Sequence, residues 1–269
     1  MSRTVTADHL VKVGQDQGLG PVVDLLRSTD EKVQQAAAAA LWSLSVTTEN
    51  KVKVVERGGL PLLIRMLRSP SVQCQEQAAG CLYSLSVLPE NKAIIVQEGG
   101  LSPLISLLRS REGEIAKQAA GCIRNLAVNQ SNKAKIIAEN ALPLIIELLS
   151  HDDVKTQELA ASALRNLAQT PEIAVRIVQA DALPPLILLM QSHERRAIEQ
   201  AVHYPLQLPP QTSSNLLYRP CVSGTYPWCR KTAIALCRRT LCSRWSACCG
   251  TSHAAPAVSF CNTLPLFPQ

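Results

Sequence analysis

Residues 121 to 132 read GCIRNLAVNQSN, and the centre of this stretch returns along the chain at a constant interval. Related phrases (LWSLS, LYSLS, IRNLA and LRNLA) begin at Leu41, Leu82, Ile123 and Leu164, so each begins 41 residues after the one before. A fixed period of this length is typical of stacked repeats rather than of a globule with one closed core. The sequence therefore predicts an array.

Each repeat is expected to contain three helices. In the unit from Leu60 to Gly100, LPLLIRMLRS forms a first helix with a proline near its start, where the fixed φ of proline fits. Ser69 or Ser71 can then cap a long helix, SVQCQEQAAGCLYSLSV, whose apolar residues follow the spacing of a buried stripe. The phrase NKAIIVQEG forms a short third helix, which Gly99 ends.

Small residues recur inside the long helix and predict how the repeats pack. Two alanine positions are kept in all four long helices, at 37, 78, 119 and 160 and at 38, 79, 120 and 161. Side chains this small allow neighbouring helices to approach to roughly 8 to 10 Å. The long helices of successive repeats are therefore expected to lie side by side.

Charge argues against a nucleic-acid partner. The net charge of +6 arises entirely after residue 202, because residues 1 to 202 carry 21 basic and 21 acidic side chains. Binding to phosphates needs clustered positive charge, which a neutral array does not offer. The start of the chain has no apolar signal region, and Ser2 replaces the glycine required for myristoylation. We expect a cytoplasmic protein, with the nucleus or a membrane periphery as alternatives.

The repeat pattern resembles the armadillo repeat. The resemblance rests on A-A-x-x-L-R-N-L-A, followed by N-K and then G-A-L-P-x-L-I-x-L-L. It is clearest in AASALRNLAQ (160–169), NKAKIIAENALPLIIELL (132–149) and NKAIIVQEGGLSPLISLL (91–108). It implies an all-α, right-handed α-solenoid with three helices per repeat, whereas the rival HEAT repeat has two. The units look like the vacuole-associated and β-catenin-like branches rather than importin-α.

Three segments follow from the pattern. Residues 1–18 are expected to form an N-terminal cap or partial helix, and residues 19–202 form four repeats and a truncated fifth. Residues 203–269 are a non-repeat tail that is rich in cysteine and proline, has six basic residues and no acid, and is predicted to be disordered.

The armadillo resemblance implies a protein-interaction scaffold that binds extended peptide segments in a groove of long helices. In β-catenin and importin-α, an asparagine of the long helix holds the backbone of the ligand. The matching positions here are Ser43, Ser84, Asn125 and Asn166. Asparagine suits this role because its amide both donates and accepts hydrogen bonds.

The residue before each of these positions changes from aromatic to cationic, in the order Trp42, Tyr83, Arg124 and Arg165. This order favours a ligand with an apolar end and an acidic end. Asn129, just after the third long helix, completes the candidate groove residues. Two structural alternatives stay open: the aromatic rings pack against the next repeat, or the arginines pair with Glu158 and nearby acids.

The importin-α form of the groove is not expected. It requires a tryptophan four residues before the asparagine, and the chain has Ala39, Gly80, Gly121 and Ser162 there. Catalysis is not expected either, since the five histidines do not recur with the repeat. Asp152 and Asp153 after His151 suit helix capping better than metal binding. We therefore predict no enzyme activity, no cofactor and a monomer that binds protein.

The tail allows three interpretations. It can be a sequence without a selected fold, as an altered reading frame would produce. It can instead be a basic membrane-contacting segment, RKTAIALCRRTLCSRWSACCG (230–250), acylated at Cys248 or Cys249; the protein would then be a membrane-surface adaptor. A zinc site is the third interpretation, although its candidates Cys221, Cys229, Cys237 and Cys242 lack a C-x-x-C motif.

Overall fold

The computed structural model describes residues 18–191, and every regular element within this range is helical. The helices follow the predicted order of first, long and short helix. The first helices are α2 (Leu19–Leu25), α5 (Gly59–Met66), α8 (Leu101–Leu107), α11 (Leu142–Glu147), which the 3-10 turn η1 (Leu148–Ser150) extends, and α14 (Leu183–Gln191). The long helices are α3 (Glu31–Leu44), α6 (Val72–Leu85), α9 (Gly113–Leu126) and α12 (Val154–Leu167). The short helices are α4 (Thr48–Glu56), α7 (Pro89–Gln97), α10 (Gln130–Ala138) and α13 (Pro171–Gln179).

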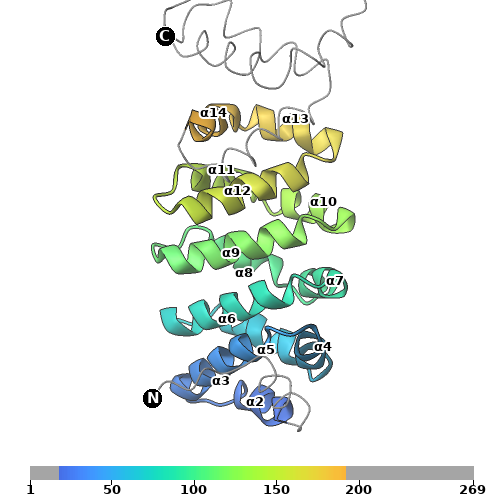
Figure 1. The fold of residues 1–269 in the computed structure, drawn as a ribbon, viewed down its shortest axis with the longest axis vertical. Coiled ribbons are helices and arrows are strands. Elements are labelled where there is room, and N and C mark those ends of the chain that lie inside the picture. The colour runs from blue at the N-terminus through green and yellow to red at the C-terminus, as the bar shows by residue number, and fades with distance from the viewer. Residues whose placement is uncertain (1–17, 192–269) are drawn as a thin grey trace, which may run out of the picture. The chain divides into compact units, whose positions relative to one another are not determined.

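The long helices form a continuous layer, as the alanine positions predict. Helix α3 packs on α6, α6 on α9 and α9 on α12, so each lies beside its equivalent in the next repeat (Figure 1). Ala37, Ala78, Ala119 and Ala160 are all buried. The predicted all-α fold with three helices per repeat is confirmed. The predicted cap at 1–18, apart from Gly18, and the tail at 203–269 lie outside the described residues.

Local capping chemistry sets where the long helices begin. The side chains of Asp30, Ser71 and Asp153 accept backbone amides at the starts of α3, α6 and α12. Such caps satisfy amides that have no partner within the helix. Of the two predicted capping serines, Ser71 caps α6, while Ser69 accepts the amide of Ser71 in the preceding turn.

The recurring N-K phrase has a structural role at the other end of each long helix. Asn50, Asn91 and Asn132 are buried and donate through Nδ2 to the carbonyl oxygens of Leu44, Leu85 and Leu126, at 2.9, 2.9 and 3.3 Å. These carbonyls belong to the last residues of α3, α6 and α9. The asparagine recurs because it fastens the short helix to the end of the long one.

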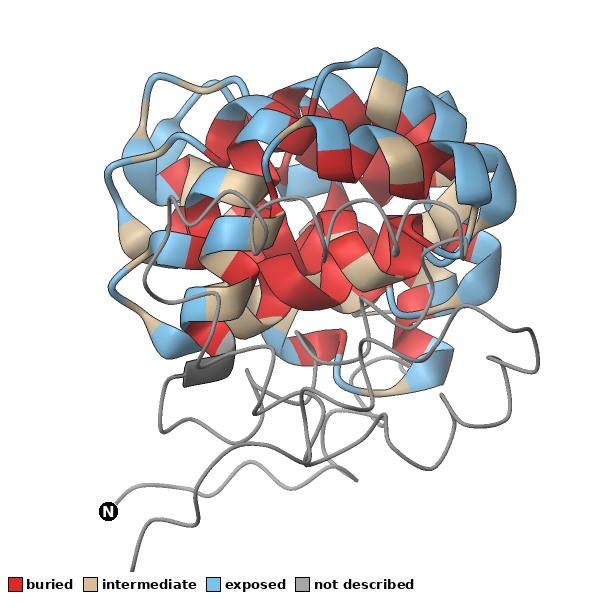
Figure 2. Ribbon diagram, turned by 90° about the horizontal axis from the view of Figure 1, so that it is seen from above, coloured by how far each residue is buried: buried red, intermediate tan, exposed pale blue. Residues whose placement is uncertain are grey.

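The core lies where the three helices of a repeat face one another and face the next repeat. Buried residues line the inner sides of the helices and exposed residues the outer sides (Figure 2). The repeated leucine positions Leu41, Leu82, Ile123 and Leu164 are fully buried. Each such side chain contributes about 1.5–3 kcal/mol through its removal from water. The period of the sequence is therefore the period of the core.

Candidate functional site

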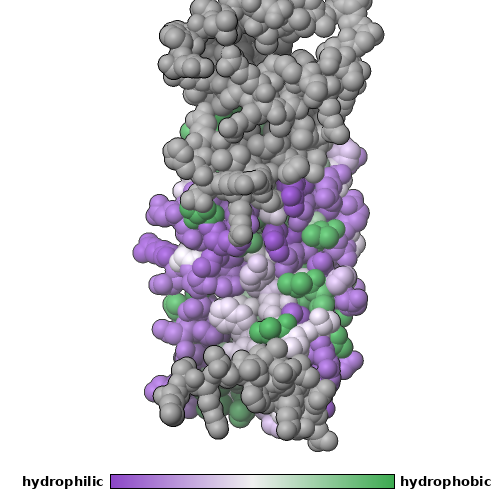
Figure 3. Space-filling view, in the orientation of Figure 1, coloured by the Kyte–Doolittle hydropathy of each residue, from purple (hydrophilic) through white to green (hydrophobic). Residues whose placement is uncertain are grey.

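Four partly exposed side chains occupy one position in the last turn of successive long helices. They are Trp42 on α3, Tyr83 on α6, Arg124 on α9 and Arg165 on α12, and we call them the long-helix row. None is fully buried or fully exposed. Residues of intermediate hydropathy, drawn pale, gather along the middle of the face on which the long helices lie (Figure 3). Because α3, α6, α9 and α12 pack side by side, the four predicted residues occupy equivalent positions on one layer of helices.

The two aromatic rings of the row lie flat against glycines of the next long helix. A Cβ atom added to Gly80 would lie 2.7–2.8 Å from Cε3, Cδ2 and Cε2 of Trp42. Because Cδ2 is shared by both rings of the indole and has no free edge, Gly80 must face the flat side of the ring. A Cβ on Gly121 would lie 2.7 Å from Cε2 of Tyr83 and 2.9 Å from both its ring neighbours, which again indicates a face-on approach.

This contact explains a feature that sequence reasoning missed. Gly80 and Gly121 had argued only against an importin-type tryptophan, but each makes room for the ring of the preceding repeat. The signal was present as a constant separation of 38 residues from Trp42 to Gly80 and from Tyr83 to Gly121. The alternative that the rings pack against the next repeat therefore holds for one face of each ring.

The amide positions next to the row bridge successive repeats. Asn125 and Asn166 are only 6% and 7% exposed. Nδ2 of Asn125 donates to Oγ of Ser86 at 2.8 Å, and Nδ2 of Asn166 donates to the carbonyl oxygen of Arg124 at 3.0 Å. Ser84 likewise donates to the carbonyl oxygen of Ser45, whereas Ser43 is exposed. The donors of Asn125, Asn166 and Ser84 are therefore already used in packing between repeats. That these residues hold the backbone of a ligand stays a prediction.

The two arginines of the row differ in their partners. Arg124 donates through Nε and Nη2 to Oδ1 of Asn125, at 3.2 and 2.7 Å. The side chain of Arg165 makes no hydrogen bond or ion pair with any residue between 18 and 191. The acid considered as its partner, Glu158, pairs instead with Lys155 at 2.8 Å. Arg165 therefore presents a half-buried guanidinium whose five donors are available to a ligand.

Asn129 has a capping role in the structure. It precedes α10, and its Oδ1 accepts hydrogen bonds from the backbone amide and the hydroxyl of Ser131 at 2.9 and 2.7 Å. This is the N-cap arrangement that favours asparagine. Its side chain is partly exposed, and its place in the groove stays a prediction.

The cluster that could have held a metal is a helix cap. Asp153 accepts the amide and the hydroxyl of Thr156 at 2.9 and 2.7 Å. Burial alone would raise the pKa of Asp153, but the hydrogen bonds from Thr156 and the amide of Lys155, with the nearby Lys117, hold it below its usual value. Nδ1 of His151 accepts the amide of Asp153 at 3.0 Å. Within the part of the chain described, no group of three potential metal ligands occurs.

His151 belongs to a recurring turn that sequence reasoning overlooked. It stands where earlier repeats have Ser28, Ser69 and Ser110, whose hydroxyls accept the amide two residues ahead at 3.1, 3.1 and 3.2 Å. The imidazole of His151 and the hydroxyls of the serines thus accept the same backbone hydrogen bond in this turn. The signal was present in the sequence as three serines at intervals of 41 residues, and only His151 departs from it.

The three cysteines of the array are buried free thiols between the long helices. Burial raises the pKa of Cys81 to about 12, and it raises the pKa of Cys122 further. A thiol held protonated is a poor nucleophile and a poor metal ligand. Cys74, Cys81 and Cys122 therefore serve as small apolar residues of the core.

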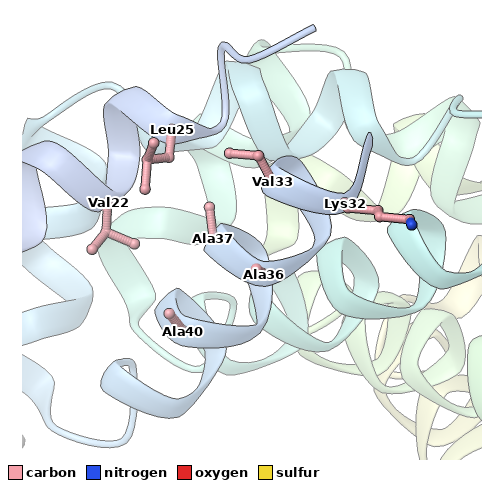
Figure 4. A pocket seen from close by; sticks show the side chains of 7 residues that line it. All are labelled: Val22, Leu25, Lys32, Val33, Ala36, Ala37 and Ala40. Carbon is pink, nitrogen blue, oxygen red and sulfur yellow. The ribbon is translucent and has the colours of Figure 1, made fainter. Parts of the chain in front are cut away.

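An apolar hollow of about 340 Å³ lies between α2 and α3 (Figure 4). Val33 and Ala40 of its wall occupy the positions of Cys74 and Cys81, which are buried against α3. Helix α6 contacts the preceding long helix, α3, through the side that carries Cys74 and Cys81. The hollow lies on the equivalent side of α3. Leu25, which also lines it, is 48% exposed.

None of the described helices is long and apolar enough to cross a membrane. The tail cysteines and the basic segment proposed for membrane contact lie beyond residue 191, outside the described part of the chain.

Comparison with solved structures supports the same fold. An engineered protein superposes with a TM-score of 0.72 at 29% identity, covering 75% of this chain and 50% of its own. This chain therefore spans half the length of that structure. A computationally designed armadillo repeat protein has a TM-score of 0.71 at 25% identity, covering 82% of this chain and 98% of its own. Another designed armadillo repeat protein has a TM-score of 0.70 at 24% identity, covering 81% and 98%.

No curated protein matches the sequence. The armadillo/beta-catenin-like repeat matches four consecutive segments, residues 7–46, 47–87, 89–128 and 129–169, which together make up more than half of the chain. Each of the last three segments runs from a short helix to the end of a long one, in the order that the structure shows. The chain belongs to the armadillo/beta-catenin-like repeat family.

Proposed function

We propose that this protein is a non-enzymatic scaffold that binds an extended segment of a partner protein along the long-helix row. Membership of the armadillo/beta-catenin-like repeat family supports a role as a scaffold. One structural neighbour at 25% identity is described as designed for modular peptide recognition. The observation that carries the proposal is the row itself. Four partly exposed side chains repeat at one position along adjacent helices, so they can contact residues spaced along one extended chain.

The chemistry of the row favours a ligand with an apolar part and an acidic part. Trp42 and Tyr83 offer ring surfaces over α6 and α9, and Arg165 on α12 offers a guanidinium that has no partner among residues 18–191. A guanidinium binds a carboxylate through two parallel hydrogen bonds, which adds both affinity and orientation. The acidic part of the ligand would therefore lie over α9 and α12, next to Arg124 and Arg165.

The test is a charge reversal of both arginines in the full-length chain. We expect Arg124→Glu with Arg165→Glu to weaken binding of a fluorescein-labelled Gly/Ser peptide carrying two glutamates by at least tenfold, about 1.4 kcal/mol. Fluorescence anisotropy measures the binding. Arg165→Glu alone should leave the unfolding midpoint in urea near that of the wild type, because the Arg165 side chain has no partner among the described residues, whereas Arg124→Glu also removes the hydrogen bonds to Asn125.

A matched control is available one helix away. Arg68 and Arg109 are exposed, follow the first helices α5 and α8, and are also 41 residues apart. Arg68→Glu with Arg109→Glu makes the same change in net charge and should leave the affinity for the acidic peptide within about twofold. Equal losses in both double variants would show a general charge effect and contradict the proposed site.

A further inference from the structure

We propose that Trp42 and Glu76 form a second subsite that binds a lysine or arginine side chain of the same partner segment. This inference rests on the proposed function and adds a basic end to the ligand, opposite the acidic end. The subsite is built by two long helices: α3 supplies the indole, and α6 supplies the glycine beneath it and the acid beside it.

The indole of Trp42 is fixed as a flat surface. Gly80 covers one face of the ring, since the added Cβ meets three ring atoms at 2.7–2.8 Å. The side chain is nevertheless only partly buried, so its accessible area belongs to the opposite face and to the edges. The face of an aromatic ring carries negative partial charge and attracts cations, most strongly in tryptophan.

Glu76 supplies a negative charge beside this surface. It precedes Gly80 by four residues on α6, and residues four apart lie on the same face of a helix. The side chain is partly exposed and makes no hydrogen bond or ion pair with the residues that the structure describes. A partly exposed indole ring and a carboxylate that has no partner among the described residues thus lie on one face of α6, which is an arrangement that suits an ammonium or guanidinium group.

The equivalent place in the next repeat lacks this combination. Tyr83 lies over Gly121 in the same way, but the residue four before Gly121 is Lys117. Lys117 forms an ion pair with Glu114, which raises the pKa of the lysine despite its partial burial. A cation over Tyr83 would meet Lys117, so the basic end of a ligand belongs at Trp42 and not at Tyr83.

The positions of the two subsites fix the spacing of charges in the ligand. The Trp42 ring lies over α6, and Arg165 is on α12, two repeats further on. Adjacent helices are roughly 10 Å apart, which gives about 20 Å between the subsites. An extended chain covers this distance in about six residues at roughly 3.3 Å each. The ligand should therefore carry its basic and acidic side chains about six positions apart.

The experiment uses the full chain with Trp228→Phe and Trp245→Phe, which leaves Trp42 as its one tryptophan. Three peptides are compared by calorimetry: a Gly/Ser peptide with two lysines and, six positions on, two glutamates; the same peptide with both lysines acetylated; and the peptide with glutamates alone. Acetylation removes the charge but keeps most of the stem. We expect it to weaken binding roughly three- to tenfold, and only the lysine peptide should change the emission of Trp42.

Variants of the subsite should remove this preference for lysine. With Glu76→Gln, the lysine and acetyl-lysine peptides should bind equally, while the affinity for the peptide with glutamates alone stays unchanged. Trp42→Leu should likewise remove the difference between the lysine and acetyl-lysine peptides. Glu98→Gln is the matched control, because Glu98 is an exposed acid that follows α7, away from the long helices. Glu76→Asp should restore part of the preference.

The results separate failure of this inference from failure of the proposed function. If acetylated and unmodified peptides bind equally to the wild type, or if Trp42 emission does not respond to the lysine peptide, the cation subsite is refuted. Binding of the peptide with glutamates alone, and its loss in Arg124→Glu with Arg165→Glu, would then still support the proposed function. If no peptide binds, both proposals are wrong.

Discussion

At the scale of single residues, one position shows how strongly the repeat constrains the backbone. Gly58, Gly99, Asn140 and Asp181 are 41 residues apart and all have positive φ, at 75°, 76°, 55° and 58°. They lie just after the short helices, where a left-handed residue ends a helix. Glycine adopts this conformation without strain, and asparagine and aspartate tolerate it better than most other residues. The chain therefore uses three residue types for one geometric requirement.

This requirement gives a test in which only backbone strain changes. A Cβ on Gly99 would meet no atom within 4 Å, so Gly99→Ala introduces no clash. We expect a loss of about 1–2 kcal/mol in the free energy of unfolding, because alanine must adopt positive φ. Urea unfolding measures the loss. As a control, Asn140→Gly at the equivalent position should be neutral or slightly stabilising, and a destabilised control would contradict the explanation.

The cap at Asp153 gives a prediction that depends on pH. The pKa of Asp153 is lowered in the folded state, so its stabilising effect is present above the unfolded-state value of about 3.9 and is lost as pH falls through the folded value. We expect Asp153→Ala to cost about 1 kcal/mol at pH 7. The difference in unfolding free energy between wild type and variant should shrink below pH 4, as followed by urea unfolding at several pH values. A constant difference would show that the charge is not involved.

At the scale of helices, contacts between neighbouring long helices decide what their exposed face can do. Tyr83 of α6 rests on Gly121 of α9, and Asn166 of α12 donates to the carbonyl of Arg124. The repeated phrase shows that these residues share a position. It does not show that a ring is seated on the next helix or that an amide is already used, because both depend on side-chain rotamers across two helices.

The contact between Tyr83 and Gly121 predicts a strong coupling. Gly121→Ala places a Cβ 2.7 Å from the tyrosine ring, so the ring must move or the helices must separate. We expect a loss of about 1–3 kcal/mol. In a double-mutant cycle, Tyr83→Ala should remove most of this loss, and the interaction energy should lie between about 0.5 and 3 kcal/mol. Additive effects in urea unfolding would show that the two residues do not touch.

At the scale of the whole array, stability should vary with position. Helix α3 packs on one other long helix among the described residues, whereas α6 and α9 each pack on two. The stability of a stacked array is close to a sum of repeat and interface terms, so a helix with one interface opens more readily. We expect amides of α3 to exchange with deuterium faster than the equivalent amides of α6, measured by mass spectrometry. Equal rates in α3, α6 and α9 would instead indicate that the array opens as one unit.

The sequence alone determined the period, the three helices of each repeat, the capping serines and aspartates and the close packing at alanine. These features depend on residue type and spacing along one chain, and a fixed interval repeats them until they stand out. Only the tertiary structure decided which side chains of the candidate site are already engaged in contacts within the array. Whether Trp42 covers Gly80, whether the amide of Asn125 is occupied and whether Arg165 stays unpaired all depend on contacts between residues about 38 to 42 positions apart. Such contacts follow from the distance between helices and the directions of their side chains, which the order of residues does not specify.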